Sequence, residues 1–421
     1  MKQLFISPSY IPVDSSVTLL NAKILDQLEK QGIDSIILTV SIDDTKYKIT
    51  PNLIEIFPSN RTVYRVRSFE IGGKILSIFR RLLNKIFPVF FYAPDYHFIW
   101  EILAILKLFQ IKKNHKIDII HSVSAPHCSH VVGLFAKLLF RKPWVCHLDD
   151  FWVDQPAEHY GKYRYINSWI EKFCFNKSDK ILSSSKEILE LAGKRYSLEI
   201  RKKFIFIPPG YNSNDYPKVK LNQNSKYKFT YLGVFYKENR EPLSIIKALH
   251  FIKNNHYEIY KKIEFKFIGL KEQKYEIEIC RLDLNNVSFI DRVDYWESMR
   301  QMKLATILVH IGYISDRFKN DIHISGKIFE YFGAERLILG VTTPLGPVSD
   351  IIKNNNGIVC DYNNHFDIAK KIVAIVNKYK ISDLYNWENP PEIKDKYDIN
   401  SVSSNYKKLF YSLINNKENC V

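Results

Sequence analysis

Short apolar runs and longer amphipathic stretches alternate along most of the chain. Residues 3–7 and 35–40 have the length and composition of buried strands, and residues 18–30 between them repeat apolar positions at helical spacing. A loop rich in proline and serine joins the first strand to the helix, and Gly32 ends the helix. This order of strand, loop, helix and strand is typical of a doubly wound parallel sheet with helices on its faces.

The same order of elements restarts in the second half of the chain. A Pro-Pro-Gly turn opens a polar run that predicts a linker over residues 211–228. Further strands are predicted on both sides of it, at residues 118–121, 144–147, 180–184, 204–207, 229–232, 265–268, 287–290 and 306–311. We therefore predict an α/β protein with an N-terminal domain over residues 1–210, a second domain over 229–384 and a C-terminal helical segment over 385–421.

The length and composition of the chain favour a globular enzyme of two domains. Its 421 residues exceed what one ordinary core holds, and 46% apolar with 25% charged residues is usual for a globular protein. No apolar run of about eighteen residues predicts a membrane-spanning helix, and the N-terminus lacks the long apolar core of a signal peptide. The six cysteines lack paired spacing, which argues against a zinc site and a disulfide framework, so we expect a cytoplasmic protein.

The net charge of +16 suggests an anionic partner, although a lysine-rich composition alone would also produce it. The basic residues are scattered and belong to no recognisable nucleic-acid-binding module, so we expect no nucleic acid partner. Residues 73–87 predict a helix with apolar residues on one face and Lys74, Arg81 and Lys85 on another. Such a helix either lies on an anionic membrane, here the inner face of the cytoplasmic membrane, or packs on the first sheet.

The segment after the strand at 306–311 carries the most informative pattern of the chain. Ser325, Gly326 and Lys327 form a polar turn that enters a short amphipathic helix, and Glu330 lies early in this helix. A carboxylate beside a helix N-terminus that follows a strand is where the ribose and phosphates of a nucleotide would lie. A solvated helix carboxylate is the alternative for Glu330.

This segment resembles the donor-sugar signature of glycosyltransferase family 4, whose members are retaining, nucleotide-sugar-dependent enzymes of the GT-B fold. The resemblance implies two Rossmann-like doubly wound domains facing across a cleft, with the nucleotide-sugar donor bound by the second domain. It implies further that the C-terminal helical segment over residues 385–421 returns to the first domain. It also implies that Glu330 holds the ribose hydroxyls, with Ser325 and Lys327 beside it. Gly346 lies in a Pro/Gly turn where the backbone would approach the donor closely.

The loop after the first strand of the second domain resembles the diphosphate-binding loop of the family. Family members follow a glycine at this place with two basic residues that grip the donor diphosphate. Gly233 matches the glycine, Arg240 is the best match to the second basic residue, and Lys237 could substitute. Because the leaving group is a diphosphate, a fixed cation and helix-start amides would stabilise its charge. An ordinary surface arginine is the alternative for Arg240.

The first half resembles a bacterial subgroup of the family that builds surface polysaccharides. The matching motifs occur in the subgroup's order: Ala93-Pro-Asp, Asp118-Ile-Ile-His, Ala125-Pro-His and Lys142-Pro-Trp-Val, the last running on to Trp152. Asp150, at the end of a strand, could orient an acceptor hydroxyl or cap the next helix. His127 lies in a loop predicted over 125–130, before a helix at 131–139, and could contact the reacting sugar or serve structure.

These features predict a retaining glycosyltransferase that moves a sugar from a nucleotide diphosphate sugar to a saccharide acceptor. By analogy the acceptor is lipid-linked, and the product belongs to a bacterial capsule, O-antigen or other surface polysaccharide. The resemblance implies no cofactor and no essential metal, because the departing phosphate oxygen is thought to take the acceptor proton. The expected partners are thus the nucleotide-sugar donor, the saccharide acceptor and an anionic membrane.

Three departures from the family pattern leave other functions open. Val234 stands where the first basic residue often lies, and the family's Gly-Gly is replaced by Asp-Ser-Ser at residues 14–16. The first of the two signature glutamates is missing, because Ile322 takes its place between Asp321 and His323. One alternative is a non-catalytic partner subunit that keeps the fold, and the other is a nucleotide-sugar epimerase of the same fold.

Overall fold

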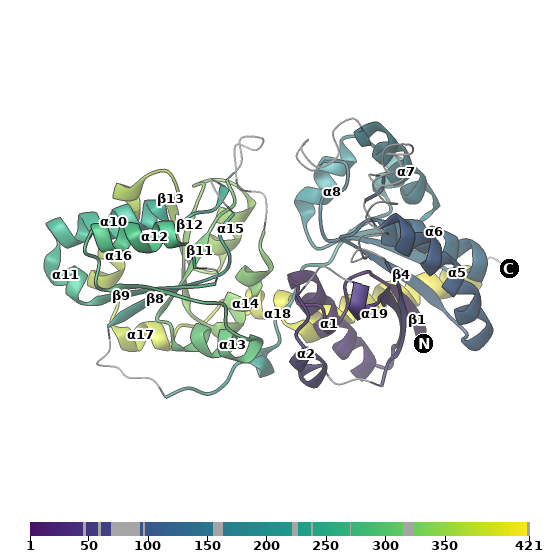
Figure 1. Cartoon of the computed structure of the whole chain (residues 1–421), viewed down its shortest axis with the longest axis horizontal. Helices are drawn as coiled ribbons and strands as arrows, with labels where there is room; N and C mark the ends of the chain where they lie inside the picture. The colour runs from purple at the N-terminus through teal and green to yellow at the C-terminus, as the bar shows by residue number, and fades with distance from the viewer. Residues whose placement is uncertain are drawn as a thin grey trace. The chain divides into compact units, whose positions relative to one another are not determined.

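The chain divides into two compact units, which are described separately (Figure 1). The first unit contains Met1–Pro209 and Ile399–Val421, and the second contains Gly210–Asp398. The computed structural model describes residues 1–44, 48–57, 60–68, 93–95, 97–154, 163–220, 226–236, 239–269, 271–314, 321 and 324–418. The helix predicted at 73–87 therefore lies outside the described residues.

The first unit is built on a sheet of seven parallel strands in the order β3-β2-β1-β4-β5-β6-β7. The strands are β1 (Lys2–Ile6), β2 (Asp34–Val40), β3 (Thr62–Val66), β4 (Ile119–Ser124), β5 (Trp144–Leu148), β6 (Lys180–Ser183) and β7 (Phe204–Phe206). Every side chain of β4 and β5 is buried, as expected for a parallel sheet covered on both faces. The direction of strand order reverses between β1 and β4, so the loops that follow these two strands diverge at the centre of the sheet.

Helices cover both faces of the first sheet. They are α1 (Ser16–Lys30), α2 (Asn52–Ile56), α5 (Phe98–Asn114), α6 (Cys128–Phe140), α7 (Arg164–Lys177), α8 (Lys186–Gly193), α9 (Leu198–Arg201) and the last helix, α19 (Ile399–Glu418). On one side α5 packs on α6 and α6 on α7, whereas on the other α1 packs on α19. Tyr406 and Phe410 of α19 are buried in the same core as Ile119 and Val145 of the central strands. The end of the chain is therefore part of the first unit.

The second unit repeats this design with six parallel strands in the order β10-β9-β8-β11-β12-β13. These strands are β8 (Tyr227–Leu232), β9 (Ile263–Ile268), β10 (Val287–Ile290), β11 (Ile307–Ile311), β12 (Leu337–Thr342) and β13 (Ile358–Asp361). The helices are α10 (Leu243–Asn255), α11 (Tyr257–Lys261), α12 (Gln273–Arg281), α13 (Tyr295–Leu304), α14 (Gly326–Ala334), α15 (Pro347–Asn354), α16 (His365–Lys378), α17 (Ile381–Tyr385) and α18 (Pro391–Tyr397). Strand order reverses between β8 and β11, again at the centre of the sheet.

Two Rossmann-like units with parallel sheets confirm the predicted α/β fold class. One core joins the inner faces of β8, β9, β11 and β12 to α10, α12 and α16, so the second unit has a hydrophobic interior of its own. Within the part of the chain that the structure describes, no helix is long and apolar enough to cross a membrane.

Candidate functional site

The predicted donor residues of the second unit gather at the carboxyl edge of its sheet. Reversal of the strand order there places the loop after β8 beside the loop after β11. The two loops are tied together, because Asn239 Nδ2 donates to Tyr313 Oη at 3.1 Å and the Ile314 amide donates to the Asn239 carbonyl at 2.8 Å. Open α/β sheets bind ligands at this kind of crevice.

Arg240 supplies a fixed positive charge at this edge. Its guanidinium lies over the rings of Tyr236 and Tyr313, with 5.4 and 5.9 Å between the guanidinium carbon and the ring centroids. Its Nε is buried and has no hydrogen-bond partner within the described part of the chain. Burial and, secondarily, the charge of Arg240 lower the pKa of His310 on β11 to about 3, so that imidazole is neutral. A guanidinium held in place by two aromatic rings suits an anionic diphosphate.

Tyr331 of α14 joins the two central strands of this sheet. Its hydroxyl accepts the Leu232 amide of β8 at 3.1 Å and donates to the Val309 carbonyl of β11 at 3.2 Å. Burial raises the pKa of this hydroxyl, and the charges of both Glu330 and Arg240 act on it. Glu330 and Arg240, which are 90 positions apart in the sequence, thus both act on the pKa of one buried hydroxyl, which Glu330 raises and Arg240 lowers. Sequence reasoning missed Tyr331, and its only signal was its place directly after Glu330.

The helix that carries Glu330 begins as predicted from the polar turn. Ser325 is the N-cap of α14, and its Oγ accepts the Lys327 amide at 3.4 Å, while the Lys327 side chain is half-buried. Glu330 is half-buried, and its backbone carbonyl accepts Tyr216 Oη at 2.6 Å. Burial is the main cause that raises the pKa of the Tyr216 and Tyr295 hydroxyls, and the Glu330 carboxylate adds to it. The Glu330 carboxylate thus acts on the pKa of both tyrosines, and its role in donor binding stays a prediction.

Asp321 makes a buried connection between the ends of β11 and β12. Its Oδ2 accepts the Tyr313 amide at 3.1 Å and Thr342 Oγ1 at 2.9 Å, while its own amide donates to Thr343 Oγ1 at 2.9 Å. The fit is tight, because a Cβ added to Gly312 would lie 2.3 Å from this oxygen. Sequence reasoning noted Asp321 only as a neighbour of the missing glutamate. Its contacts lie with strands that the sequence pattern could not place beside it.

The two glycines predicted for donor binding have different settings. The Gly233 amide already donates to the Ile268 carbonyl at 2.9 Å, and a Cβ on Gly269 would lie only 1.9 Å from the Gly233 oxygen. Gly269 thus allows the backbones after β8 and β9 to approach closely, whereas a Cβ on Gly233 would lie 2.7 Å from the Tyr231 hydroxyl. Gly346 has φ +112°, a conformation that favours glycine, and directly precedes α15 at the end of the β12 loop. Lys237 lies outside the described residues.

In the first unit, His127 and Asp150 lie in the loops that follow β4 and β5. His127 is buried and stacks on Trp152 with 4.9 Å between ring centroids, and its Nε2 lies 3.2 Å from the Phe151 carbonyl. Burial lowers the pKa of His127 to about 4, against smaller opposing contributions from Asp95 and the Phe151 carbonyl. Because a carbonyl only accepts, Nε2 carries the proton of the neutral ring and Nδ1 is an acceptor. Asp150 is half-buried, and its Oδ1 accepts the Phe151 amide at 2.8 Å.

A buried polar network holds the loop that contains Trp152. Asn167 Oδ1 accepts Trp152 Nε1 at 3.0 Å, and Glu171 Oε2 accepts the Val153 amide at 3.1 Å. Glu171 is further fixed by Arg195 at 2.8 Å. Burial is the largest influence on the pKa of Glu171 and raises it, although Arg195 acts in the opposite direction. Both anchoring residues are on α7, so this helix positions the loop of Asp150.

Beneath the loops, His121 of β4 and His147 of β5 lie side by side in the sheet. Their rings stack at 5.4 Å, with His121 Nε2 3.2 Å from His147 Nδ1. Asp149 Oδ1 lies 3.0 Å from His147 Nε2, a close electrostatic contact without good hydrogen-bond geometry, and accepts Ser184 Oγ at 2.8 Å. No group of three or more His, Cys, Asp or Glu residues is arranged to hold a metal ion among the residues that the structure describes.

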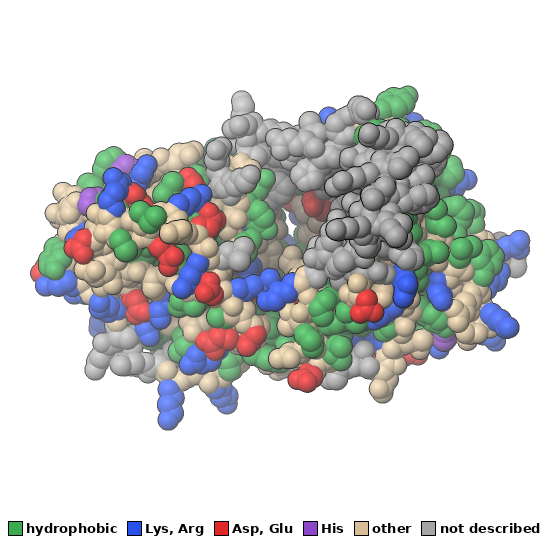
Figure 2. Space-filling model, viewed as in Figure 1, with side chains coloured by type: hydrophobic (Ala, Val, Ile, Leu, Met, Phe, Trp, Pro, Cys, Tyr) green, Lys and Arg blue, Asp and Glu red, His purple; other side chains and the backbone are tan. Residues whose placement is uncertain are grey.

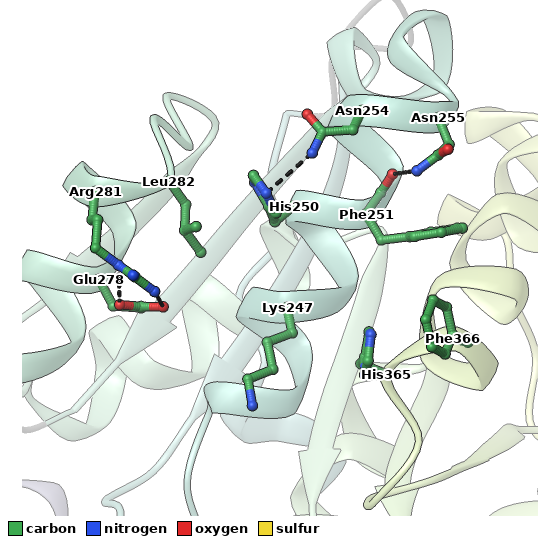
Figure 3. A pocket seen from close by; sticks show the side chains of 10 residues that line it. All are labelled: Lys247, His250, Phe251, Asn254, Asn255, Glu278, Arg281, Leu282, His365 and Phe366. Carbon is green, nitrogen blue, oxygen red and sulfur yellow. Dashed lines mark hydrogen bonds and ion pairs between the residues drawn. The ribbon is translucent and has the colours of Figure 1, made fainter.

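A separate hollow of about 340 Å³ lies on the second unit between α10, α12 and the start of α16 (Figure 3). Its polar side chains bond mainly to one another, for Glu278 pairs with Arg281 at 2.7 Å and Asn254 bonds to His250 at 3.1 Å. Phe251 and Phe366 lie at one end of it (Figure 3). None of the predicted donor residues that the structure describes lines this hollow.

Comparisons with known proteins agree with this architecture. Residues 22–215 match the family model described as Glycosyltransferase Family 4. An uncharacterized glycosyltransferase of Methanocaldococcus jannaschii is 24% identical over 375 residues, which cover 86% of this chain and 90% of that protein.

Two solved structures, one with bound UDP and glucose and one of a galactosyltransferase, have the same fold. HepE of Anabaena, in complex with UDP and glucose, superimposes with a TM-score of 0.67 at 14% identity and covers 98% of this chain and 100% of HepE. The lipopolysaccharide outer core galactosyltransferase WaaB gives a TM-score of 0.61 at 14% identity, covering 98% and 99%. The match to Glycosyltransferase Family 4 thus covers residues 22–215, and the likeness to solved structures shows that the chain as a whole has the GT-B fold.

Proposed function

We propose that this protein is a retaining glycosyltransferase that transfers a sugar from a nucleotide diphosphate sugar to a saccharide acceptor. The observation that carries the proposal is that Arg240, after β8, and α14, which carries Glu330, both lie at the carboxyl edge of the second sheet, where Tyr331 of α14 bonds to β8 and β11. A cation and a carboxylate at the carboxyl edge of a doubly wound sheet are the groups that a nucleoside diphosphate requires. HepE, which has the same fold, was solved with UDP and with UDP-glucose.

In the proposed reaction the bond between the sugar and the diphosphate breaks while the acceptor hydroxyl bonds to the same carbon. Negative charge develops on the leaving diphosphate, and the positive charge of Arg240 stabilises it. Glu330 accepts hydrogen bonds from the ribose hydroxyls, with Ser325, Lys327 and the Gly346 turn nearby. The departing phosphate oxygen takes the acceptor proton, so the reaction needs neither a separate base nor a metal or other cofactor.

The acceptor side of the proposal rests on the first unit. His127 offers a hydrogen-bond acceptor at Nδ1, and Asp150 follows the end of β5, where an acceptor hydroxyl would approach. We infer a lipid-linked saccharide acceptor and a role in bacterial surface polysaccharide synthesis at the cytoplasmic face of the membrane. The order of motifs in residues 93–152 supports this. The lipopolysaccharide outer core galactosyltransferase WaaB has the same fold.

Thermal unfolding with a panel of nucleoside diphosphates and their sugars tests the donor site. A ligand at a hundredfold excess over its Kd adds about 2.7 kcal/mol to stability, so a true donor raises the midpoint clearly. The shift should disappear in Glu330→Ala and persist in Glu258→Ala, which removes a carboxylate that is 78% exposed on α11. A selective hit then identifies the nucleotide for transfer assays with saccharide acceptors.

The alternatives give different results in the same experiments. If no nucleotide shifts the midpoint, the chain is a non-catalytic partner subunit and the proposal is wrong. If the hit sugar is converted to its epimer without any acceptor, the protein is an epimerase of the same fold. Transfer of the sugar with its anomeric configuration kept is the result that the proposal requires.

A further inference from the structure

The helices α5, α6 and α7 of the first unit expose large apolar side chains away from the sheet. The outward residues, here called the apolar face, are Leu106, Phe109, Phe135, Leu138, Tyr165 and Trp169. Tyr165 is 85% and Trp169 65% exposed, and Phe173 stacks on Trp169 with 5.7 Å between ring centroids. Figure 2 shows hydrophobic surface beside basic side chains at the edge of this unit where these helices lie.

The apolar face is an organised surface, not a scatter of single residues. On α5, Ile102, Leu106 and Phe109 repeat at helical spacing, and on α7 Tyr165 and Trp169 do the same. Because α5 packs on α6 and α6 on α7, the exposed stripes belong to adjacent helices. Neighbouring stripes of exposed apolar side chains on a surface indicate an interaction site.

These helices carry a net positive charge. They contain seven basic residues, of which Lys137 is paired with Asp179 at 2.6 Å; the others are Lys107, Lys112, Lys113, Arg164, Lys172 and Lys177. Their two acidic residues do not offset this charge at the surface. Glu171 is buried, and burial raises the pKa of the half-buried Glu101 to about 8.

We propose that the apolar face docks on an anionic lipid bilayer. Aromatic and aliphatic side chains enter the boundary between headgroups and acyl chains, while lysine and arginine bind the anionic headgroups. A second copy of the chain fits this surface less well, because a symmetric dimer would set the same basic residues against one another. The charge pattern therefore selects an anionic membrane over self-association.

Docking through the apolar face would attach the first unit to the membrane by the same helices that position its loops after β4 and β5. The helix α6 begins directly after His127, and α7 carries the Asn167 and Glu171 that fix the loop of Trp152. Docking deepens the proposed function, which places the protein at the membrane, by assigning the surface that contacts the lipid. Its test needs no catalytic activity, so failure of either proposal can be recognised separately.

Co-sedimentation of the full chain with lipid vesicles tests the apolar face. We expect binding to vesicles of phosphatidylcholine with phosphatidylglycerol, much weaker binding to phosphatidylcholine alone, and loss of binding at high salt. The double variant Phe109→Ser with Trp169→Ser should bind about tenfold more weakly. Lys113→Gln with Lys172→Gln should weaken binding about fivefold for each lysine removed.

A matched control replaces exposed aromatic residues elsewhere. Tyr257→Ser with Trp296→Ser, at positions 55% and 47% exposed on the second unit, should leave vesicle binding unchanged. All variants should keep the same circular dichroism and the same nucleotide-induced thermal shift. Equal binding of every variant, or no binding to anionic vesicles, overturns the proposal. So does a concentration-dependent dimer that Trp169→Ser abolishes, because the face would then be a subunit interface.

Discussion

At the scale of single residues, Arg240 gives the most direct test of donor binding. Its guanidinium lies over two tyrosine rings, and a lysine would keep the charge but not the planar fork. We expect Arg240→Lys to weaken nucleoside diphosphate binding about tenfold and Arg240→Ala about a hundredfold, the range that charge-assisted hydrogen bonds provide. Calorimetric titration measures this. Arg281→Ala, whose side chain is 68% exposed, should bind normally, and equal affinities for all variants would contradict the role of Arg240.

Glu101 of α5 predicts a pH dependence of stability. Burial, aided by the charge of Asp95, raises its pKa from 4.5 to about 8, and its Oε2 has no partner within the described part of the chain. The folded state therefore holds a proton that the unfolded state releases, so this group makes stability fall as pH rises from about 4.5 to about 8. The loss is about 1.4 kcal/mol for each unit of the shift that is retained in solution.

Replacement of Glu101 by its neutral isostere removes this titration. Urea unfolding of Glu101→Gln at about pH 5 and about pH 8 should show a flatter pH dependence than that of the unmodified chain, with the gain at the higher pH. Glu55→Gln, at an exposed position on α2, should leave the slope unchanged. If the slopes of all three proteins coincide, Glu101 is ionised in the folded state.

At the scale of elements, hydrophobic spacing was enough to predict the two parallel sheets, but not where each helix begins. Residues 125–130 were predicted as a loop before a helix at 131, whereas α6 begins at Cys128. The reason is a long-range contact: Asp95 Oδ2 accepts the Cys128 amide at 2.9 Å and satisfies the helix start. Tyr331 and Asp321 escaped prediction for the same reason, because their partners come from strands that only the fold brings together.

The packing of α14 gives a prediction with a control on the same helix. A Cβ on Gly333 would lie 2.5 Å from the Tyr216 ring, and Tyr216 is held by its bond to the Glu330 carbonyl. We expect Gly333→Ala to destabilise the protein by about 1–3 kcal/mol and to weaken donor binding, because Tyr216 must move. Gly326→Ala meets no atom within 4 Å and should be neutral or slightly stabilising. Thermal unfolding of the two variants with and without nucleotide measures both effects. Equal midpoints for the two variants would show that Tyr216 moves aside at no cost in stability.

At the scale of the whole molecule, the two units differ in how the chain builds them. The first is discontinuous, because α19 returns to it: Gln31 Nε2 donates to Ser403 Oγ at 2.7 Å, and Tyr406 packs on His121 with ring centroids 5.9 Å apart. The second is one continuous segment with a core of its own. The α/β class of both units followed from the sequence, whereas nothing in the spacing of apolar residues could assign α19 to its partner strands.

This difference predicts how the two units respond to truncation. A fragment of residues 210–398 contains every described donor residue and its own core, so it should fold cooperatively and keep the nucleotide-induced thermal shift of the full chain. A chain ending at residue 398 lacks α19, which exposes the core around Ile119, Val145 and Leu182, so its first unit should lose its unfolding transition. Calorimetric scans of the two proteins measure both effects. If the fragment unfolds without cooperativity, the second unit does not fold on its own. If the first unit melts normally without α19, this helix is not essential to its core.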